Sequence, residues 1–260
     1  MSSAPTYVPG HGLLRDRVAV VTAAAGAGIG GATARRMLEE GAKVLVSDAH
    51  ERRLRETESA LSAEFGADSV AAVPCDVTRE DQVTAMFDAA LVKFGRVDTV
   101  VNNAGLGGTA RLVEMTDEQW HRVLDVTLTG TMRCTRHALR LMSGQGTGVV
   151  VNNASVIGWR AQEGQAHYAA AKAGVMGLTR CAAVEAAESG VRVNAVAPSL
   201  AMHPHLEKVT SPDLLTELTD KEAFGRYAQP WEVANVIVFL ASDYSSYMTG
   251  ETVSVSSQRA

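Results

Sequence analysis

Short apolar runs rich in β-branched residues alternate along the chain with longer stretches in which apolar positions recur at a helical period. Each run is continuously apolar, which is typical of a strand buried on both faces of a parallel sheet that helices cover. The runs that predict strands span residues 17–22, 42–48, 69–76, 97–103, 147–155, 191–198 and 251–256.

The stretches between these runs predict helices of a dozen or more residues, for example over 78–95 and 231–242. Gly41, Gly95 and Gly190 stand where such helices should end, because glycine readily adopts the left-handed conformation of a helix C-cap. Alternation of strands and helices over the whole length predicts an α/β fold: a single-domain, Rossmann-type, doubly wound parallel sheet of about seven strands with helices on both faces.

The domain is expected to cover residues 14–260, preceded by a flexible N-terminal arm at 1–13. One long excursion, 199–225, follows the sixth predicted strand. Loops at the carboxyl ends of such strands build the binding site, so this segment is the expected substrate loop.

The composition narrows the class of protein without identifying it. Of 260 residues, 46% are hydrophobic and 20% are charged, which excludes disordered, collagen-like and coiled-coil chains. The formal net charge is −5 and no basic arm is visible, so we expect no nucleic-acid partner. No apolar stretch approaches the about 18 residues that span a bilayer, and no signal peptide is recognisable, so we expect no membrane partner and a cytoplasmic location.

Cysteine usage argues against a structural metal or a disulfide framework. Cys75, Cys134 and Cys181 are odd in number, far apart and without a CxxC pair, so we expect no metal. His203 and His205 flank a proline, but no third ligand is identifiable nearby. Substrate contact or a solvated loop is therefore favoured for these two histidines.

A glycine-rich segment, TAAAGAGIGGATARR at 22–36, lies between the first predicted strand and the helix that follows it. Glycines there allow positive φ angles and a close approach of the backbone to a pyrophosphate, which then sits at a helix N-terminus. Asp48 ends the second predicted strand about 20 residues further on, the spacing expected for a ribose ligand. Together these features predict a dinucleotide site rather than a plain tight turn. The glycines are Gly26, Gly28, Gly30 and Gly31.

Asp48 predicts NAD as the cofactor, because its carboxylate accepts hydrogen bonds from the adenosine ribose hydroxyls and repels a 2′-phosphate. Arg52 and Arg53 leave NADP open, since either side chain could fold back onto that phosphate. The other interpretation of these arginines is a solvated face of the helix predicted around them.

Tyr168 and Lys172 stand four residues apart in a helix-forming stretch, so both project from one face. A free tyrosine with a pKa of about 10 is a poor base at neutral pH, and a neighbouring ammonium is expected to lower that pKa. Ser155, at the end of the fifth predicted strand, could hydrogen-bond a substrate oxygen. The spacing alone fits a chance pair on a surface helix, but beside a nucleotide loop and this serine it predicts acid–base catalysis.

These residues together resemble the short-chain dehydrogenase/reductase family, and the resemblance extends over nearly the whole chain from Leu14 onward. It implies a nicotinamide cofactor and hydride transfer between a secondary alcohol and a ketone. It rests on the glycine loop, CDVT at 75–78, NNAG at 102–105, Ser155, Tyr168 with Lys172, and VRVNAVAP at 191–198.

The resemblance implies a role for each matching residue. Tyr168 would be the general acid/base, Ser155 would orient the substrate oxygen, and Lys172 would hold the nicotinamide ribose as well as tune Tyr168. Asp76 would border the adenine, and its alternative role is to cap the helix that starts near Thr78. The implied cofactor-binding residues are Gly26, Gly28, Ile29, Gly30, Asp48, Asp76, Val77, Asn103, Ala104, Gly105, Tyr168, Lys172, Pro198 and Ala201.

The chain departs from the family's usual pattern at several positions. Thr127 stands where an asparagine normally supports a water that links the catalytic lysine to solvent; it keeps a hydroxyl, and we count it among the catalytic residues. The glycine loop is one residue longer than usual, and Ser199 and His203 replace a glycine and a threonine after Pro198. The resemblance implies a homotetramer, although the C-terminal VSVSSQRA differs from the diglycine turn of many relatives.

Residues after the fifth predicted strand should line the pocket for a small-molecule substrate. Trp159 could pack against a bulky apolar substrate or serve as a structural lid, and Gln162 and His203 are further candidate contacts. TAAAG, NNASVIGWRAQ and ASDYSSYMTGE also resemble bacterial enzymes of sterol breakdown that act on CoA thioesters of the hydrindane remnant. The resemblance therefore implies a bulky, steroid-derived hydroxyacyl-CoA substrate. Candidate partners of the CoA pyrophosphate, each of which also fits an ordinary surface charge, are Arg160, Lys208 and Arg226.

Two other functions fit the sequence. The first is an NADPH-dependent 3-oxoacyl-thioester reductase, against which Asp48 argues. The second is a nucleotide-sensing protein on the same fold with its chemistry lost, which only Thr127 favours. Intact Ser155, Tyr168 and Lys172 favour the enzyme.

Overall fold

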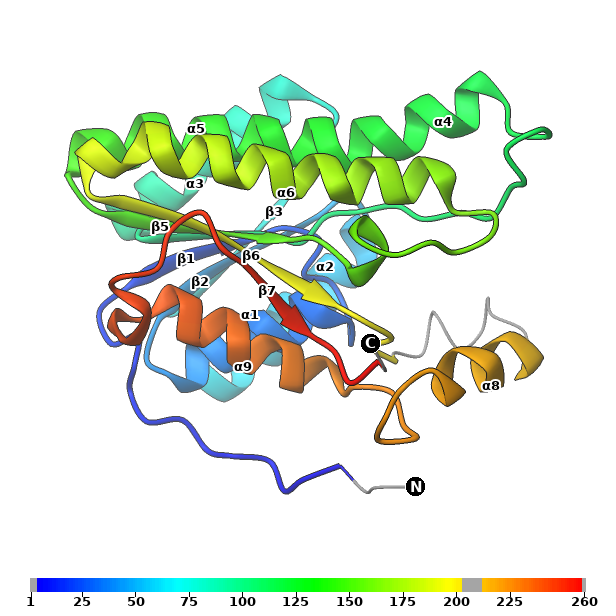
Figure 1. Cartoon of the computed structure of the whole chain (residues 1–260). Helices are drawn as coiled ribbons and strands as arrows, with labels where there is room; N and C mark the ends of the chain where they lie inside the picture. Colours follow the sequence, from blue (N-terminus) through cyan, green and yellow to red (C-terminus); the bar gives the residue numbers. More distant parts are fainter. Residues whose placement is uncertain (1–3, 203–211, 259–260) are drawn as a thin grey trace.

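The computed structural model describes residues 4–202 and 212–258, and within them seven strands form one parallel sheet (Figure 1). The strand order is β3-β2-β1-β4-β5-β6-β7. The second and third strands therefore lie on one side of β1 and the last four on its other side, where β4 pairs parallel with β1. This confirms the predicted doubly wound fold. The strands are β1 Val18–Val21, β2 Lys43–Asp48, β3 Val70–Pro74, β4 Thr99–Asn102, β5 Gly148–Asn153, β6 Val191–Pro198 and β7 Thr252–Val255.

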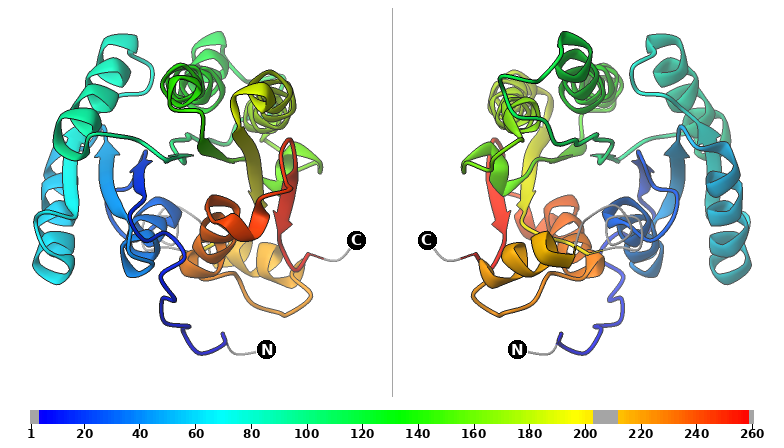
Figure 2. Two further views of the ribbon diagram at one scale, coloured as in Figure 1. Left: turned by 90° about the vertical axis from the view of Figure 1, so that its left-hand side faces the viewer. Right: turned by 90° about the vertical axis from the view of Figure 1, so that its right-hand side faces the viewer.

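Helices cover both faces of the sheet (Figure 2). Helices α1, α2 and α9 pack on one face, while α3, α5 and α6 pack on the other, with α4 leading into α5. The helices are α1 Ile29–Glu39, α2 Glu51–Phe65, α3 Glu80–Phe94, α4 Asp117–Leu124, α5 Gly130–Gln145, α6 Ala166–Ala186, α8 Pro212–Asp220 and α9 Pro230–Ala241. No helix of the described ranges combines the length and the apolarity that crossing a membrane requires.

Successive strand residues pack into opposite cores. Val21 and Val46 lie in the core under α1, α2 and α9, whereas Val20 and Leu45 lie in the core under α3, α5 and α6. Neighbouring residues of a strand point to opposite faces, so a strand covered on both sides must be apolar at every position. This explains why the strand runs in the sequence are continuous.

The glycines expected at helix ends have the conformation that glycine tolerates best. Gly95 caps α3 with a φ of 81°, and its N–H bonds the carbonyl of Leu91 at 2.8 Å. Gly41 and Gly190 also have positive φ angles, 87° and 69°. Each of these glycines ends a helical segment shortly before the next strand, as predicted.

The N-terminal arm, expected to be flexible, has no regular secondary structure over residues 4–13 but contacts α1 and α9. The Tyr7 ring meets the Trp231 ring edge-on, with 5.3 Å between centroids. The buried Glu40 carboxylate accepts the backbone N–H groups of His11 (2.8 Å) and Leu13 (3.0 Å). The described part of the arm is therefore fixed along the domain by specific contacts.

The segment after β6 reaches the end of the sheet toward which the strands point. Ala201 pairs with Ala228 in an isolated parallel bridge, and α8 follows beyond this end of the sheet (Figure 1). The candidate substrate contact His203, together with His205 and Lys208, lies outside the described residues.

Candidate active site

Ser155 lies directly after β5, at the carboxyl end of the sheet. Its side chain is buried, and its Oγ accepts the backbone N–H of Ile157 at 3.3 Å, which begins a short 3₁₀ turn. The same hydroxyl faces the Pro198 carbonyl at 3.5 Å. The ends of β5 and β6 therefore fix the position of this hydroxyl.

Tyr168 and Lys172 occupy the first turns of α6, on the helix face predicted by their spacing. The Lys172 Nζ lies 5.5 Å from the centre of the Tyr168 ring. Lys172 is buried, and its ammonium donates a hydrogen bond of 2.5 Å to the Asn153 carbonyl at the end of β5. The sheet therefore holds the lysine beside the tyrosine.

Burial, rather than the neighbouring charge, dominates the pKa values of this pair. Burial raises the pKa of Tyr168 to about 12, although the ring is partly exposed, and the Ser155 hydroxyl acts in the opposite direction. Burial lowers the pKa of Lys172 to about 8. The expected lowering of the tyrosine pKa is wrong in its net direction, because burial is the largest influence and the opposing influence comes from Ser155 rather than from Lys172. At neutral pH the tyrosine is protonated and can act as an acid.

Thr127 lies in a π-helical turn, Asp125–Thr129, between α4 and α5. Its buried Oγ1 accepts the Leu106 N–H at 2.9 Å and donates to the Leu106 carbonyl at 3.1 Å. The described side chains show no hydrogen bond from Thr127 to Ser155, Tyr168 or Lys172. Thr127 instead fixes the chain after β4.

Gly105 places this fixed segment beside Lys172. A Cβ added at Gly105 would lie 3.4 Å from the Lys172 Nζ and 3.8 Å from both the Cγ2 and the Oγ1 of Thr127. The backbone held by Thr127 therefore passes directly beside the ammonium. We regard Thr127 as a positioning residue rather than a reacting group.

The glycine loop is packed too tightly to admit side chains at two positions. A Cβ at Gly30 would overlap the Ala23 carbonyl oxygen and lie 2.5 Å from the Asn103 Nδ2. A Cβ at Gly31 would overlap the Gly26 carbonyl oxygen. Gly28 is the N-cap of α1 and supplies no side-chain cap, so the first N–H groups of the helix are available to an anion.

Polar side chains fasten the glycine loop to the ends of β4 and β5. The Thr22 Oγ1 accepts the backbone N–H groups of Asn103 (3.0 Å) and Ala104 (3.1 Å). The Asn103 side chain donates to the Ala23 carbonyl at 3.0 Å and accepts from the Asn153 Nδ2 at 2.8 Å. Neither Thr22 nor Asn153 was predicted as a site residue. Thr22 and Asn153 both contact Asn103 because β1, β4 and β5 are neighbours in the sheet, and the local sequence does not specify this strand order.

A cavity of about 500 Å³, here called the Asp48 cavity, brings together much of the predicted dinucleotide site. Its size and its open backbone suit the adenosine half of a dinucleotide. The glycines of the loop, Ile29, Asn103, Pro198 and Ala201 do not line this cavity in the described structure. The predicted cofactor residues that line it are Asp48, Asp76, Val77, Ala104 and Gly105.

Asp48 is held at this cavity by backbone N–H groups. Its Oδ2 accepts from Ala25 at 3.2 Å and its Oδ1 from His50 at 2.9 Å, so each oxygen keeps capacity for a ribose hydroxyl. Arg52 pairs with Glu56 at 2.9 Å along the exposed face of α2. The Arg53 Nε is buried without a hydrogen-bond partner, which leaves that side chain as the candidate for a 2′-phosphate.

Asp76 was expected either to border the adenine or to cap the helix that starts near Thr78. It lines the Asp48 cavity, and its Oδ1 accepts the Thr78 N–H at 2.9 Å and the Thr78 hydroxyl at 2.8 Å. The N-cap of α3 is Arg79, so Asp76 stabilises the turn before the helix rather than the helix terminus.

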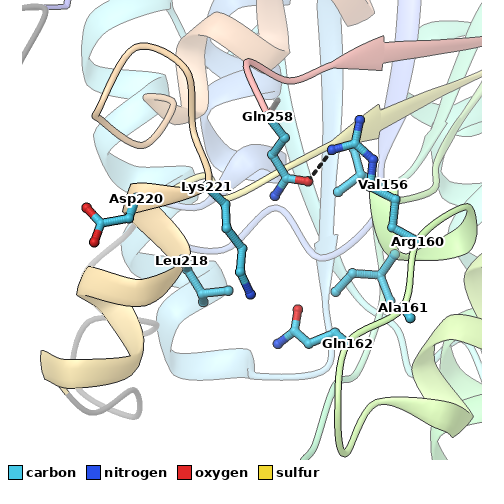
Figure 3. Close-up of a pocket in the computed structure, with 9 residues that line it drawn as sticks. Val156, Arg160, Ala161, Gln162, Leu218, Asp220, Lys221 and Gln258 are labelled. Atoms are coloured by element: carbon cyan, nitrogen blue, oxygen red, sulfur yellow. Dashed lines mark hydrogen bonds between the residues drawn. The ribbon is translucent and has the colours of Figure 1, made fainter. Parts of the chain in front are cut away.

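A second cavity, of about 410 Å³, is lined in part by the residues that follow Ser155 and is called the Arg160 cavity (Figure 3). It is bounded by the segment after β5, the end of α8 and the C-terminal tail. Gln162 lines it as predicted, whereas Trp159 is 52% exposed and lines neither cavity. The residues around the Arg160 cavity are Val156, Ile157, Arg160, Ala161, Gln162, Leu218, Asp220, Lys221 and Gln258.

Of the cations proposed for a CoA pyrophosphate, the structure distinguishes two. Arg160 lines the second cavity, whereas both terminal nitrogens of Arg226 are bound to the Glu232 carboxylate at 2.7 and 2.8 Å. Sequence analysis missed Lys221 and Gln258. They lie far from Arg160 along the chain, and no local motif marks them.

Comparison with known proteins places the chain among nucleotide-dependent oxidoreductases. A family model described as enoyl-(acyl carrier protein) reductase matches residues 23–257. The (5R,7aS)-5-hydroxy-7a-methyl-1-oxo-2,3,5,6,7,7a-hexahydro-1H-indene-carboxyl-CoA reductase of Mycobacterium tuberculosis is 61% identical over 99% of this chain and 98% of its own. The cis-4-hydroxycyclohexanecarboxylate dehydrogenase of Sinomonas cyclohexanicum is 43% identical, covering 92% and 95%. The crystal structure of a short chain dehydrogenase from Mycobacterium smegmatis, 59% identical, superposes with a TM-score of 0.88 over 99% of both chains.

Proposed function

The chain belongs to the short-chain dehydrogenase/reductase family, and we propose that this oxidoreductase interconverts a ketone and a secondary alcohol on a bulky, steroid-derived acyl-CoA thioester with NAD(H). The observation that carries the substrate class is 61% identity, over 99% of the chain, to a reductase named for a hydrindane carboxyl-CoA. The Sinomonas relative is named for a hydroxylated six-membered ring carboxylate, which supports a cyclic alcohol.

The residues of the site divide the work of a carbonyl reduction. Ser155 donates a hydrogen bond to the carbonyl oxygen, and its anchoring between β5 and β6 orients that oxygen toward Tyr168. Tyr168 donates its phenolic proton to the same oxygen as negative charge develops there. Lys172 then stabilises the phenolate that remains, and the reverse transfers serve the oxidation. The bound nicotinamide supplies or accepts the hydride.

The reducing half of the cycle starts from a protonated Tyr168 and a charged Lys172. A pKa of about 12 keeps Tyr168 protonated at neutral pH, ready to donate, whereas oxidation needs the phenolate. Lys172, with a pKa of about 8, remains largely charged at pH 7. Both states suit the proton-donating half of the cycle.

Asp48 supports NAD over NADP, because a carboxylate at the cavity rim repels a 2′-phosphate. We expect NADH to bind more tightly than NADPH in a fluorescence titration, and Asp48→Ala to narrow or reverse that preference. Unchanged preference in the variant would remove Asp48 from the ribose site.

A 3-oxoacyl-thioester reductase that uses NADPH is the second candidate, and the unpartnered Arg53 Nε favours it. Tighter NADPH binding by the wild type, lost in Arg53→Ala, would put this function first. Arg52→Ala is the matched control, because Arg52 is already paired with Glu56 on the helix surface.

We propose that the protein acts as a homotetramer in the cytoplasm, where CoA thioesters and nicotinamide cofactors are at hand. Support for self-association comes from large apolar side chains left exposed near α9 and β7: Phe239 is 36% exposed and Tyr244 74% exposed. Light scattering of the purified protein tests the assembly, and a monomeric mass would contradict it.

A further inference from the structure

We propose that the Arg160 cavity receives the phosphate-bearing CoA end of the acyl thioester, with Arg160 and Lys221 as its anion contacts. This inference rests on the proposed function and adds to it a site for the carrier, which is distinct from the site of the reacting ring.

The cavity borders the segment that follows Ser155. Val156 and Ile157 line the cavity, and they follow Ser155 directly in the chain, where the Ile157 N–H bonds the Ser155 Oγ at 3.3 Å. The far walls come from α8 and the C-terminal tail, at the outer end of the sheet. A thioester whose ring lies at Ser155 can therefore extend its carrier outward through this cavity.

Arg160 presents a positive charge that no carboxylate neutralises among the described side chains. Its Nη1 donates to the neutral Gln258 amide oxygen at 2.7 Å (Figure 3). A guanidinium with unused N–H groups is well suited to phosphate, which it can bind through two parallel hydrogen bonds. In Arg226, in contrast, both terminal nitrogens already donate to the Glu232 carboxylate.

Lys221 directly follows the last residue of α8 and lines the same cavity as Arg160. Figure 3 shows its side chain extending toward Gln162, while the Asp220 carboxylate points away from both. Lys221 pairs with Glu217 at 2.8 Å, but the two side chains are 51% and 63% exposed, so this pair contributes little and can exchange for a phosphate. The cavity thus carries two available cations.

The wall that carries Gln258 is fixed by a buried carboxylate. The Glu222 Oε2 accepts the Ser257 N–H at 3.2 Å and the Ser257 hydroxyl at 2.8 Å, and Glu222 forms an antiparallel bridge with Gln258. Gln258 is therefore held where it orients Arg160. A fixed tail keeps the guanidinium directed along the cavity before any ligand binds, which lowers the entropic cost of binding.

Binding of coenzyme A itself tests the site without requiring turnover. Calorimetry would measure the Kd of coenzyme A and of pantetheine, which lacks the phosphates, with the nicotinamide cofactor saturating so that its pocket is occupied. We expect Arg160→Ala and Lys221→Ala each to raise the Kd of coenzyme A at least fivefold and to change that of pantetheine less than twofold. Arg140→Ala and Lys93→Ala, exposed cations on α5 and α3, are the matched controls.

An unchanged Kd for coenzyme A in these variants would overturn the proposal. An equal loss of affinity for pantetheine would overturn it as well. Kinetics separate this failure from failure of the proposed function. The CoA and N-acetylcysteamine thioesters of one acid would be compared as substrates. In Arg160→Ala, the KM of the CoA ester divided by the KM of the N-acetylcysteamine ester should rise at least fivefold. Turnover of both esters with an unchanged ratio refutes the CoA site alone. Arginine-dependent coenzyme A binding without turnover of either ester refutes the proposed function and leaves the site standing.

Discussion

Replacing Thr127 with valine tests whether its hydroxyl acts by fixing the chain after β4. Valine keeps the shape and removes the one atom that satisfies both the N–H and the carbonyl of Leu106, at 2.9 and 3.1 Å. Because Leu106 is partly exposed, water replaces some of this loss, and we expect the free energy of unfolding to fall by about 1 to 3 kcal/mol. Thr127→Ser, which loses only a methyl group, should cost about 0.8 kcal/mol.

The activity of the two variants should follow the hydroxyl. Thr127→Val releases the backbone at Gly105, which passes beside the Lys172 ammonium, and we expect kcat to fall severalfold. Thr127→Ser should retain kcat within about twofold. Urea unfolding and steady-state kinetics on both variants provide the measurement. Full stability of Thr127→Val together with lost activity would refute this reasoning, because the hydroxyl would then act in the chemistry directly.

Three further predictions follow from burial and packing. Burial holds the pKa of Lys172 at about 8, below its ordinary 10.5, so its charged form destabilises the folded state fully below pH 8, and the cost fades as pH rises toward 10.5. In urea unfolding, the stability of Lys172→Met relative to the wild type should therefore fall between pH 7 and pH 10, as the cost of the buried charge in the wild type disappears; a constant difference would contradict it. In wild-type pH profiles the reduction rate should fall as pH rises through about 8, when Lys172 loses its charge, and a flat profile would exclude that role. Gly30→Ala, whose Cβ overlaps the Ala23 carbonyl, should weaken cofactor binding at least tenfold in a fluorescence titration, whereas Gly107→Ala, with open space around it, should bind like the wild type.

The fold could be predicted because burial on both sheet faces leaves a direct trace in the sequence. The run at 17–22 became β1 since every residue of Val18–Val21 is buried, with Ala19 and Val21 in one core and Val20 in the other. The helix ends could be predicted from glycines, because glycine adopts the left-handed conformation of a helix C-cap more readily than other residues. The π-helical turn around Thr127 left no such trace, because the sequence there continues a helical pattern.

The candidate site could be predicted only where its residues form local motifs. The glycine loop, Asp48, Ser155 and the pair on α6 were identifiable from spacing. The direction of the Tyr168 pKa shift was not, because it depends on desolvation by elements distant in sequence. Lys221 and Gln258 were missed for the same reason, since only the folded chain brings them to Arg160.

The most direct test of the proposed function measures NADH-dependent reduction of the keto form of the hydroxy-hydrindane carboxyl-CoA by the wild type and Tyr168→Phe. The variant keeps the ring and removes the hydroxyl group that donates the proton. We predict turnover to the alcohol by the wild type and a loss of at least about 100-fold in Tyr168→Phe, with NADH binding retained. Near-wild-type turnover by the variant would contradict the assignment of Tyr168 as the acid.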